Sequence, residues 1–495
     1  MNPPDVGVLS YGAYIPWLRM RRGTIAAAHE WFAPALRPLA QGERAIAGWD
    51  EDTVTMAVEA ARNCLLGIDR ETIGAVSLAS TTLPFADRQN SGIVKEALNL
   101  SDTVAALDVT GSQRAATSML LHALHEVGAT GGRRLCVAAD LRKAKPASEA
   151  ELRQGDAAAA VLVGHGESIA RLVGAHSVTI DFVDHFRASS TQVDYFWESR
   201  WVRDEGYIDI AGGALSECFR RCNTSPATID HLAVAILARG VPEALAKATG
   251  VRTEAVVDPL TATVGDSGAP HPLLLLSAAL DAAKPGEKIA LVGFGQGCDV
   301  LIFEVTEAVL AMAGRPRVSA ALAHRKPDAN YLRFLFHRGL LDLERGMRAE
   351  LDQKQPGTTL YRNRRAVLGL VGSRSTETGA VQFPPSELAA HSGKPTAGSY
   401  EPYPLADRDA VIVSYTADRL TYSPAPPQYY GTIDFTGGGR MIAEFTDVEP
   451  EFVWIGARAR MVFRVKAIDE LRDFKKYFWK AVPLGPGKPV QLGPI

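Results

Sequence analysis

Short β-branched runs alternate with Ala-rich amphipathic segments over residues 1 to about 308. Segments such as Thr53–Leu66 and Ala115–Val127 have helical spacing of apolar residues. This alternation predicts an α/β layered domain with largely parallel strands, in two rounds that end near Gly164 and Glu307. The runs expected to form strands are Ala75–Ser80, Val104–Val109, Leu135–Ala139, Ala159–Val163, Leu232–Leu237 and Lys288–Gly293.

The pattern changes after residue 308. Residues 313–328 are rich in Arg, Pro and Ala and indicate a connection, and Tyr331–Leu351 has the apolar spacing of an amphipathic helix. The last hundred residues are β-rich, and Thr436-Gly-Gly-Gly-Arg440 fits a hairpin loop. They predict a small antiparallel barrel. Its expected strands are Ala410–Thr416, Tyr429–Phe435, Met441–Phe445 and Arg458–Val465.

Composition narrows the class of protein. The chain has 495 residues, 46% hydrophobic and 22% charged, which is typical of a globular protein of two or three domains. A formal net charge of -3 gives no electrostatic case for nucleic acid. The chain contains no apolar run of about 18 residues, no signal peptide pattern and only five scattered cysteines. We therefore expect a cytoplasmic protein that does not bind membranes.

Several motifs are informative when they are taken together in their order along the chain. In the first 308 residues they are Gly12-Ala-Tyr-Ile-Pro16, Glu51-Asp-Thr-Val-Thr-Met-Ala-Val58, Gly155-Asp-Ala-Ala-Ala-Ala160, Val264-Gly-Asp-Ser-Gly268 and Gly293-Phe-Gly-Gln-Gly297. With them this part resembles the thiolase superfamily, nearest to the 3-hydroxy-3-methylglutaryl-CoA (HMG-CoA) synthase branch and similar to ketosynthase III. The C-terminal part has Gly369-Leu-Val-Gly-Ser-Arg374 and Val381-Gln-Phe-Pro-Pro385, and it resembles the DUF35 family, an OB-fold normally preceded by a zinc ribbon.

The resemblance implies a five-layered αβαβα core of two similar halves, a homodimer, and a tunnel that admits a coenzyme A thioester as substrate. The family's zinc-binding Cys-x-x-Cys is replaced by Ser375-Thr-Glu-Thr378, so we expect no metal. The implied domains are residues 1–165 and 166–308 for the two thiolase-like halves, 309–360 for a linker with the amphipathic helix, 361–404 for a degenerate zinc ribbon and 405–495 for the OB-fold.

The catalytic groups that the family implies are altered. Its Cys nucleophile aligns with Gln113 in the segment Asp108–Thr117, and an amide cannot form an acyl-enzyme. Ser112 is a substitute nucleophile only if the neighbouring position can reach the same spot. Thr81 or Thr82 falls near the place of the family's acid/base carboxylate, and Asp87 falls at the later acidic residue of that motif. No His follows the strand Leu232–Leu237.

Other residues are candidates for the missing chemistry. His185 aligns with an aromatic residue of the acyl pocket and could be a general base, or it could be a structural histidine satisfied by Asp184 or Asp194. Asp266, which replaces the family's Asn, could orient His185, could be the base itself with its pKa raised by burial, or could cap a helix. His271 is either a proton carrier or a loop residue.

Two further groups complete the candidate site. Gln113 could hold an enolate oxygen through its amide, as in decarboxylases related to ketosynthases, or it could mark the decay of an enzyme. Arg114 and Arg142 could contact the phosphates of coenzyme A, or they could form salt bridges instead.

The sequence therefore leaves two functional hypotheses. The first is an enzyme that makes or breaks a carbon–carbon bond of a β-keto or β-hydroxy acyl-CoA without a Cys nucleophile, by aldol/retro-aldol, retro-Claisen or decarboxylative chemistry. The second is a non-catalytic scaffold subunit that pairs with a separate thiolase. A third interpretation, nucleic-acid binding by the OB-fold through Tyr429, Tyr430 and Arg458-Ala-Arg460, conflicts with the near-neutral charge.

Overall fold

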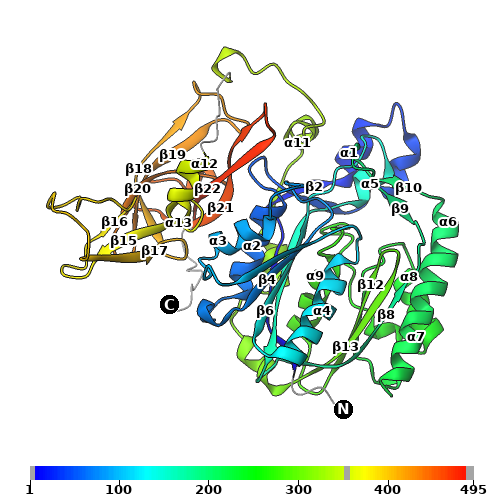
Figure 1. Ribbon diagram of the computed structural model, residues 1–495. Coiled ribbons are helices and arrows are strands. Elements are labelled where there is room, and N and C mark those ends of the chain that lie inside the picture. Colours follow the sequence, from blue (N-terminus) through cyan, green and yellow to red (C-terminus); the bar gives the residue numbers. More distant parts are fainter. Residues whose placement is uncertain (1–5, 350–356, 486–495) are drawn as a thin grey trace. The chain divides into compact units, whose positions relative to one another are not determined.

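The computed structural model describes residues 6–349 and 357–485. It divides into two compact units (Figure 1). The first unit comprises residues 1–48, 52–92 and 101–334, and the second comprises residues 49–51, 93–100 and 335–495. Within the described residues, no helix is long and apolar enough to cross a membrane.

A nine-stranded mixed sheet is the centre of the first unit. Its spatial order is β11-β12-β13-β8-β1-β7-β6-β4-β5. Three neighbouring pairs, β4–β5, β4–β6 and β11–β12, are parallel, and the other five are antiparallel. The strands are β1 (Val6–Tyr14), β4 (Ala75–Ala79), β5 (Ala105–Val109), β6 (Arg133–Asp140), β7 (Ala157–His165), β8 (Ala170–Thr179), β11 (His231–Val234), β12 (Lys288–Phe294) and β13 (Gly297–Val305).

The sheet contains the same arrangement twice. The order β4-β6-β7-β1 on one side corresponds to β11-β12-β13-β8 on the other. In each set the first pair is parallel and the next two pairs are antiparallel. The expectation of two similar halves is therefore confirmed within one continuous sheet.

Helices cover the two halves of the sheet in layers. α4 (Ala115–Thr130) and α9 (His271–Ala282) lie in the middle and pack on strands of both halves, as Figure 1 shows. α2 (Thr53–Cys64) covers the outer face of β1, β7 and β6, and α7 (Gly212–Arg221) covers β8 and β13. The result is the expected α/β/α/β/α succession.

The strands of the second half are buried on both faces, which explains their continuous apolar runs. In β12, Ile289 and Leu291 face the core that contains α4 and α9, whereas Ala290 and Val292 face the core under α7. Alternate side chains of one strand thus enter two different hydrophobic clusters.

The expectation of largely parallel strands is wrong. β12 and β13 are joined by only two residues, Gly295 and Gln296, and such a tight connection can join only antiparallel strands. Gln296 adopts a positive φ of 47°, as such a turn requires. An alternation of strand and helix patterns along the sequence is therefore compatible with a mixed sheet and does not require parallel strands.

Shorter elements accompany this core, and two of them, α3 and α11, are divided between the two units. η3 is a π-helix, which is unusual at ten residues. The shorter elements are β2 (Leu18–Arg21), α1 (Arg22–Ala28), η1 (Pro34–Leu39), β3 (Glu43–Ile46), α3 (Asn90–Ala97), α5 (Glu149–Arg153), β9 (His185–Phe186), β10 (Tyr195–Phe196), α6 (Ser199–Trp201), η3 (Val202–Ala211), α8 (Val241–Thr249), α10 (Val318–Ala323), β14 (Lys326–Pro327) and α11 (Tyr331–His337).

The second unit is built on antiparallel sheets. Five strands run in the order β20-β19-β18-β21-β22, and a parallel bridge between Phe445 and Ala481 joins the two ends. This is the expected small barrel, and β15, β16 and β17 form a separate three-stranded sheet before it. The elements are α12 (Gly357–Arg362), α13 (Arg364–Val367), β15 (Val371–Ser375), β16 (Val381–Gln382), β17 (Tyr400–Pro404), β18 (Ala410–Asp418), β19 (Gln428–Phe435), β20 (Arg440–Glu444), β21 (Arg458–Asp469) and β22 (Phe474–Pro483).

The long amphipathic helix expected over Tyr331–Leu351 is much shorter. α11 ends at His337, and Gly339 follows with a positive φ of 65°. A glycine in this conformation ends a helix at little cost, which outweighs the apolar periodicity beyond it. Leu351 lies outside the described residues.

Charged side chains are buried within the second unit. The Lys480 ammonium lies 2.9 Å from the Asp50 carboxylate and 4.0 Å from the centre of the Trp49 ring. Arg464, fully buried, lies 3.2 Å from Glu51. Burial alone would raise the pKa of Asp50, but Lys480 and Arg464 outweigh it and lower that pKa.

We expect the substitution Lys480→Met to lower the free energy of unfolding by about 3 kcal/mol, because it leaves a buried carboxylate with one partner fewer. Urea denaturation at neutral pH measures the change. Lys466→Met is the matched control, because Lys466 also pairs with a carboxylate, that of Glu444, but its side chain is 45% exposed. The control should cost no more than about 1 kcal/mol. Equal losses in the two variants would contradict this account of the cluster.

Candidate functional site

A pocket lies where the N-termini of α4 and α9 converge. Gln113 comes just before α4, and Gly268 and Pro272 lie at the start of α9. Backbone N–H groups at two helix N-termini favour negative charge at such a point. The residues that line the pocket are Gln113, Asp184, Tyr207, Ala235, Ile236, Leu237, Asp266, Gly268, Pro272 and Phe294.

Two glycines shape the turn that carries Gln113. Gly111 has a φ of 93°, which lets the chain turn sharply between β5 and α4. Gly295, in the loop between β12 and β13, lies so close that an added Cβ would be 2.5 Å from Ser112 Oγ and 3.2 Å from the Gln113 nitrogen. The glycine-rich motif at 293–297 therefore serves close backbone packing against the turn.

Gln113 and Asp184, which line the pocket, form a hydrogen-bonded series with His185, which lies between them and does not itself line the pocket. Gln113 Nε2 lies 2.9 Å from His185 Nε2, and His185 Nδ1 lies 2.9 Å from Asp184 Oδ1. The ring of His185 also stacks on Phe196, with the ring centres 5.7 Å apart. The side chains of Asp184 and His185 are 9% and 13% exposed, so water competes weakly for these bonds.

The two contacts together select one tautomer of the neutral imidazole. The Asp184 carboxylate can only accept, so Nδ1 carries the proton and donates it. Nε2 then has a free lone pair, which accepts from the Gln113 amide. The expected pairing of His185 with Asp184 is present, and the lone pair points toward Gln113.

Asp266 is held by a buried arginine. Arg142, which is 2% exposed, donates to an Asp266 carboxylate oxygen at 2.7 Å, and the Gly268 N–H donates to the same group at 2.9 Å. Burial alone would raise the pKa of Asp266, but Arg142 and the nearby His271 outweigh it and lower the pKa to about 2. The expected rise is therefore wrong, because the charge of Arg142 exceeds the effect of burial.

His271 is the first residue of α9 and not part of a loop. Its Nδ1 lies 3.0 Å from Ser267 Oγ and its Nε2 lies 3.0 Å from the Pro259 carbonyl oxygen. The side chain is fully buried, and burial lowers its pKa. Both ring nitrogens are thus occupied, and His271 does not line the pocket.

Ser112 and Arg114 flank Gln113 but do not line the pocket. Ser112 Oγ donates to the Gly295 carbonyl at 2.9 Å. Arg114 is buried and pairs with Asp299 at 2.9 Å, so the structure shows the salt-bridge alternative for this residue. The same holds for Arg142, which is occupied by Asp266.

Thr82 and Asp87 also lie outside the lining of the pocket. Thr82 Oγ1 donates to the buried Asp140 carboxylate at 2.9 Å. Asp87 is exposed.

Two lining residues had no separate signal in the sequence. Phe294 belongs to the motif at 293–297 but was not expected to face a pocket. Tyr207 comes from the π-helix η3, and its hydroxyl lies 3.4 Å from Asp184 Oδ2. An irregular helix cannot be recognised from apolar periodicity, because that periodicity assumes 3.6 residues per turn.

Neither a thiol nor a metal cluster is found at the pocket. All five cysteines are described, four are buried, and none is among the lining residues. Within residues 6–349 and 357–485, no group of three His, Cys, Asp or Glu side chains could hold a metal ion. The absence of zinc from the sheet formed by β15, β16 and β17 stays a prediction.

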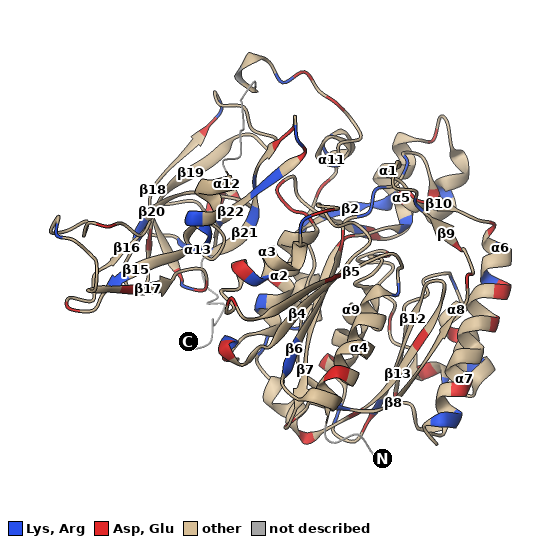
Figure 2. Ribbon diagram, in the orientation of Figure 1, with Lys and Arg blue, Asp and Glu red and all other residues tan. Residues whose placement is uncertain are grey.

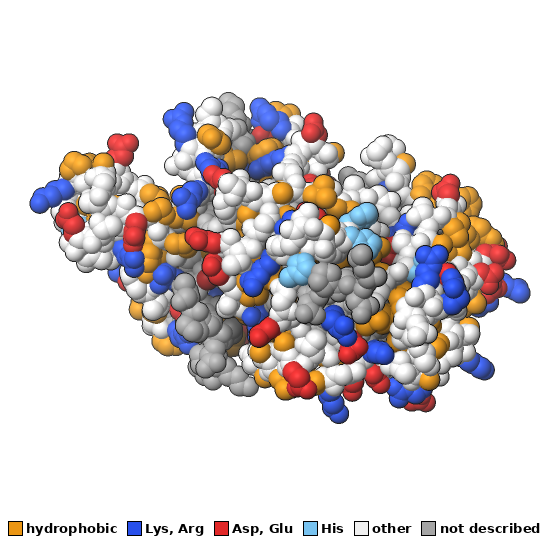
Figure 3. Space-filling view, turned by 60° about the horizontal axis from the view of Figure 1, so that its bottom comes forward, with side chains coloured by type: hydrophobic (Ala, Val, Ile, Leu, Met, Phe, Trp, Pro, Cys, Tyr) orange, Lys and Arg blue, Asp and Glu red, His pale blue; other side chains and the backbone are white. Residues whose placement is uncertain are grey.

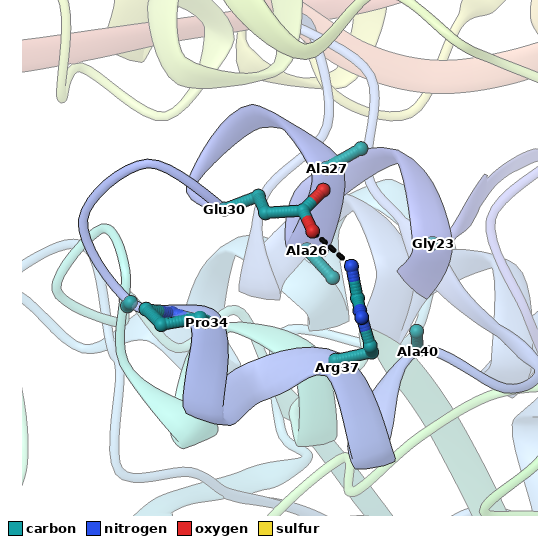
Figure 4. A pocket seen from close by; sticks show the side chains of 8 residues that line it. Gly23, Ala26, Ala27, Glu30, Pro34, Arg37 and Ala40 are labelled. Carbon is teal, nitrogen blue, oxygen red and sulfur yellow. Dashed lines mark hydrogen bonds and ion pairs between the residues drawn. The ribbon is translucent and has the colours of Figure 1, made fainter.

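A second cavity lies between α1 and η1, as Figure 4 shows. Small side chains, including Ala26, Ala27 and Ala40, line it, and Glu30 pairs with Arg37 at its edge. No titratable group other than this exposed ion pair lines it, so it offers no chemistry comparable to the first pocket.

The charges on the outer surface are mixed in sign. Figure 2 shows acidic and basic bands along α7, where Glu217 pairs with Arg220 and Arg221. On the face in Figure 3, acidic and basic side chains are interspersed. This face has no large field of one sign of the kind that steers a protein toward nucleic acid.

Known proteins are similar to both parts of the chain. The HMG-CoA synthase of Pyrococcus furiosus is 29% identical over 307 residues, 61% of this chain and 86% of the relative. The HMG-CoA synthase of Methanosarcina mazei is 28% identical over 348 residues, 68% of this chain and 99% of the relative. The family model for the C-terminal OB-fold domain of ChsH2 matches residues 403–464.

Solved structures share the fold. A structure of HMG-CoA synthase complexed with CoA superposes with a TM-score of 0.57 at 19% identity, covering 71% of this chain and 94% of that one. 3-Oxoacyl-(acyl carrier protein) synthase III of Pseudomonas aeruginosa PAO1 gives 0.55 at 20% identity, covering 61% and 98%. The chain therefore consists of a thiolase-like domain of the HMG-CoA synthase and 3-oxoacyl synthase III type and a C-terminal OB-fold domain of the ChsH2 (DUF35) type.

Proposed function

We propose that this protein makes or breaks a carbon–carbon bond of a β-hydroxy or β-keto acyl-CoA thioester without a covalent acyl-enzyme. The observation that carries the proposal is the series Asp184–His185–Gln113 at the pocket. An amide at the nucleophile's position cannot be acylated. The lone pair of His185 Nε2 accepts from the Gln113 amide in the ligand-free protein, and we propose that it accepts the proton of the substrate once this amide turns to the substrate oxygen.

The substrate class rests on the relatives. One similar solved structure is an HMG-CoA synthase complexed with CoA, and another is described as a complex with 3-hydroxy-3-methylglutaryl coenzyme A. A thioester carbonyl placed between the N-termini of α4 and α9 would meet backbone N–H donors. We place the acyl group of the substrate there, and we propose that the protein is a homodimer like other members of the superfamily.

Retro-aldol cleavage of a β-hydroxy thioester illustrates the chemistry. His185 Nε2 takes the proton of the β-hydroxyl, the Cα–Cβ bond breaks, and its electron pair forms the thioester enolate while the β-carbon leaves as a carbonyl compound. The Gln113 amide donates to the enolate oxygen. The proton on Nε2 then returns to Cα, which restores the neutral imidazole.

The same groups serve related reactions. Run in reverse, the sequence is an aldol addition. Loss of CO2 from a thioester that carries a free carboxylate on Cα passes through the same enolate. Water attack on the β-carbonyl of a β-keto thioester breaks the Cα–Cβ bond and releases the enolate in a retro-Claisen cleavage. Asp184 stabilises the imidazolium that forms in the proton transfer. Asp266, which is paired with Arg142, holds the pocket residue Gly268 in place through its backbone N–H.

We expect His185→Ala to lower kcat with acetoacetyl-CoA or HMG-CoA by about 100-fold or more, because the proton acceptor is lost. Gln113→Ala should lower kcat by about 100-fold as well, because the enolate oxygen loses a donor. Release of acetyl-CoA measures both. His122→Ala, an exposed histidine on the same helix α4, is the control and should retain full activity. Full activity in the His185 and Gln113 variants would refute the assignment.

The pH profile tests Asp266 as the alternative base. Arg142 lowers the pKa of Asp266 to about 2, so a reaction that used this carboxylate as base would lose kcat/KM only near pH 2. We expect a fall of kcat/KM at a higher pH, which would exclude Asp266 as the base. A profile that stays flat down to about pH 2 would favour Asp266 over His185.

A scaffold role is the second candidate, and the Gln113 amide together with the ChsH2-type OB-fold favours it. In this role the chain would support a thiolase partner that supplies the cysteine. Native mass spectrometry of the protein purified from its own source separates the two functions. A homo-oligomer that turns over thioesters supports the enzyme, and a stable complex with a thiolase subunit together with inactivity of the isolated chain supports the scaffold.

A further inference from the structure

We infer that Tyr207 is a positioning residue, and that its hydroxyl holds Asp184 so that His185 keeps one tautomer. The inference deepens the proposed function and rests on it for the role of His185 as base. Tyr207 Oη lies 3.4 Å from Asp184 Oδ2, while Asp184 Oδ1 lies 2.9 Å from His185 Nδ1. The two oxygens of one carboxylate thus face two different donors.

The position of Tyr207 follows from the π-helix η3 and the glycine before it. A Cβ on Gly206 would be 2.4 Å from Cε1 of Phe182, so only glycine lets this ring pack against the helix. The Tyr207 ring meets Phe294 edge-to-face, with the ring centres 5.0 Å apart. Phe294 therefore packs on the Tyr207 ring and Phe182 packs on the backbone just before it, and this arrangement directs the hydroxyl toward Asp184.

The Tyr207 hydroxyl keeps its proton in this environment and therefore acts as a hydrogen-bond donor. Burial first, and then the nearby Asp184 and Asp266 carboxylates, raise the pKa of Tyr207, while Arg142 opposes them. These are the charged groups that act on Tyr207. Tyr207 therefore stays protonated and donates, and the carboxylate cannot take its proton.

The consequence concerns the imidazole. Asp184 Oδ1 also accepts from the His185 backbone N–H at 3.0 Å, so without Tyr207 the carboxylate would be held through this one oxygen only. A turn about the Cβ–Cγ bond of Asp184 could then keep the backbone bond and weaken the bond to Nδ1. The ring could then carry its proton on Nε2, which would leave no lone pair toward the pocket. The Tyr207 hydroxyl removes this freedom by occupying the second oxygen.

The substitution Tyr207→Phe tests the inference, because it removes one oxygen and keeps the ring packing. The readout is the ¹⁵N spectrum of histidine-labelled, ligand-free protein at a pH where His185 is neutral, with the His185 signals assigned from His185→Gln. We expect the ratio of the Nε2–H to the Nδ1–H tautomer of His185 to rise by about fivefold, the effect of losing one ordinary hydrogen bond. An unchanged ratio would overturn the inference.

Two further variants make the result specific. Tyr195→Phe, which alters an exposed tyrosine on the neighbouring strand β10, should leave the tautomer ratio unchanged. Gly206→Ala should raise the ratio although Tyr207 is present, because the added Cβ displaces the helix from Phe182. A rise with Tyr195→Phe, or no rise with Gly206→Ala in protein that retains its circular dichroism spectrum, would contradict the positioning role.

The outcome is independent of turnover. The tautomer is measured without substrate, so a protein that cleaves no thioester can still show the shift, and then only the proposed function fails. Conversely, activity that depends on His185 with an unchanged tautomer ratio in Tyr207→Phe would retain the proposed function and refute the role of Tyr207.

Discussion

The chemistry of the pocket depends on an imidazole that is bound at both nitrogens. Asp184 accepts from one nitrogen of His185 and Gln113 donates to the other. A carboxylate can only accept and an amide N–H can only donate, so the two partners leave the neutral ring a single tautomer. The rest of the pocket supports this geometry: Arg142 holds Asp266, and burial reduces competition from water.

Internal duplication explains how these groups meet. Each half of the sheet directs one central helix at the same point, so α4 brings Gln113 and α9 brings Gly268 and Pro272 to a common pocket. His185 comes from the β9–β10 ribbon, outside the duplicated strands. The repeated strands and helices thus supply the two helix N-termini at the pocket. The β9–β10 ribbon, which is not part of the repeat, supplies His185.

Sequence reasoning predicted the layered fold because strands buried on both faces have long apolar runs, as in β12. It predicted the direction of the strands less well, since a two-residue loop such as Gly295–Gln296 decides direction and periodicity does not. At the site, the pairing of His185 with Asp184 followed from their adjacency. The pKa of Asp266 and the position of Tyr207 did not, because they depend on Arg142 and on a π-helix that come together only in three dimensions.

The close packing of Gly295 has a consequence for folding. This loop belongs to the second half of the thiolase-like domain, yet it lies against Ser112 and Gln113 of the first half, with no room for a methyl group. The turn that carries the amide is therefore completed only when the last two strands of the sheet are in place. A chain cut between the halves would leave this turn unsupported, so the pocket cannot take its final form before synthesis has passed β13.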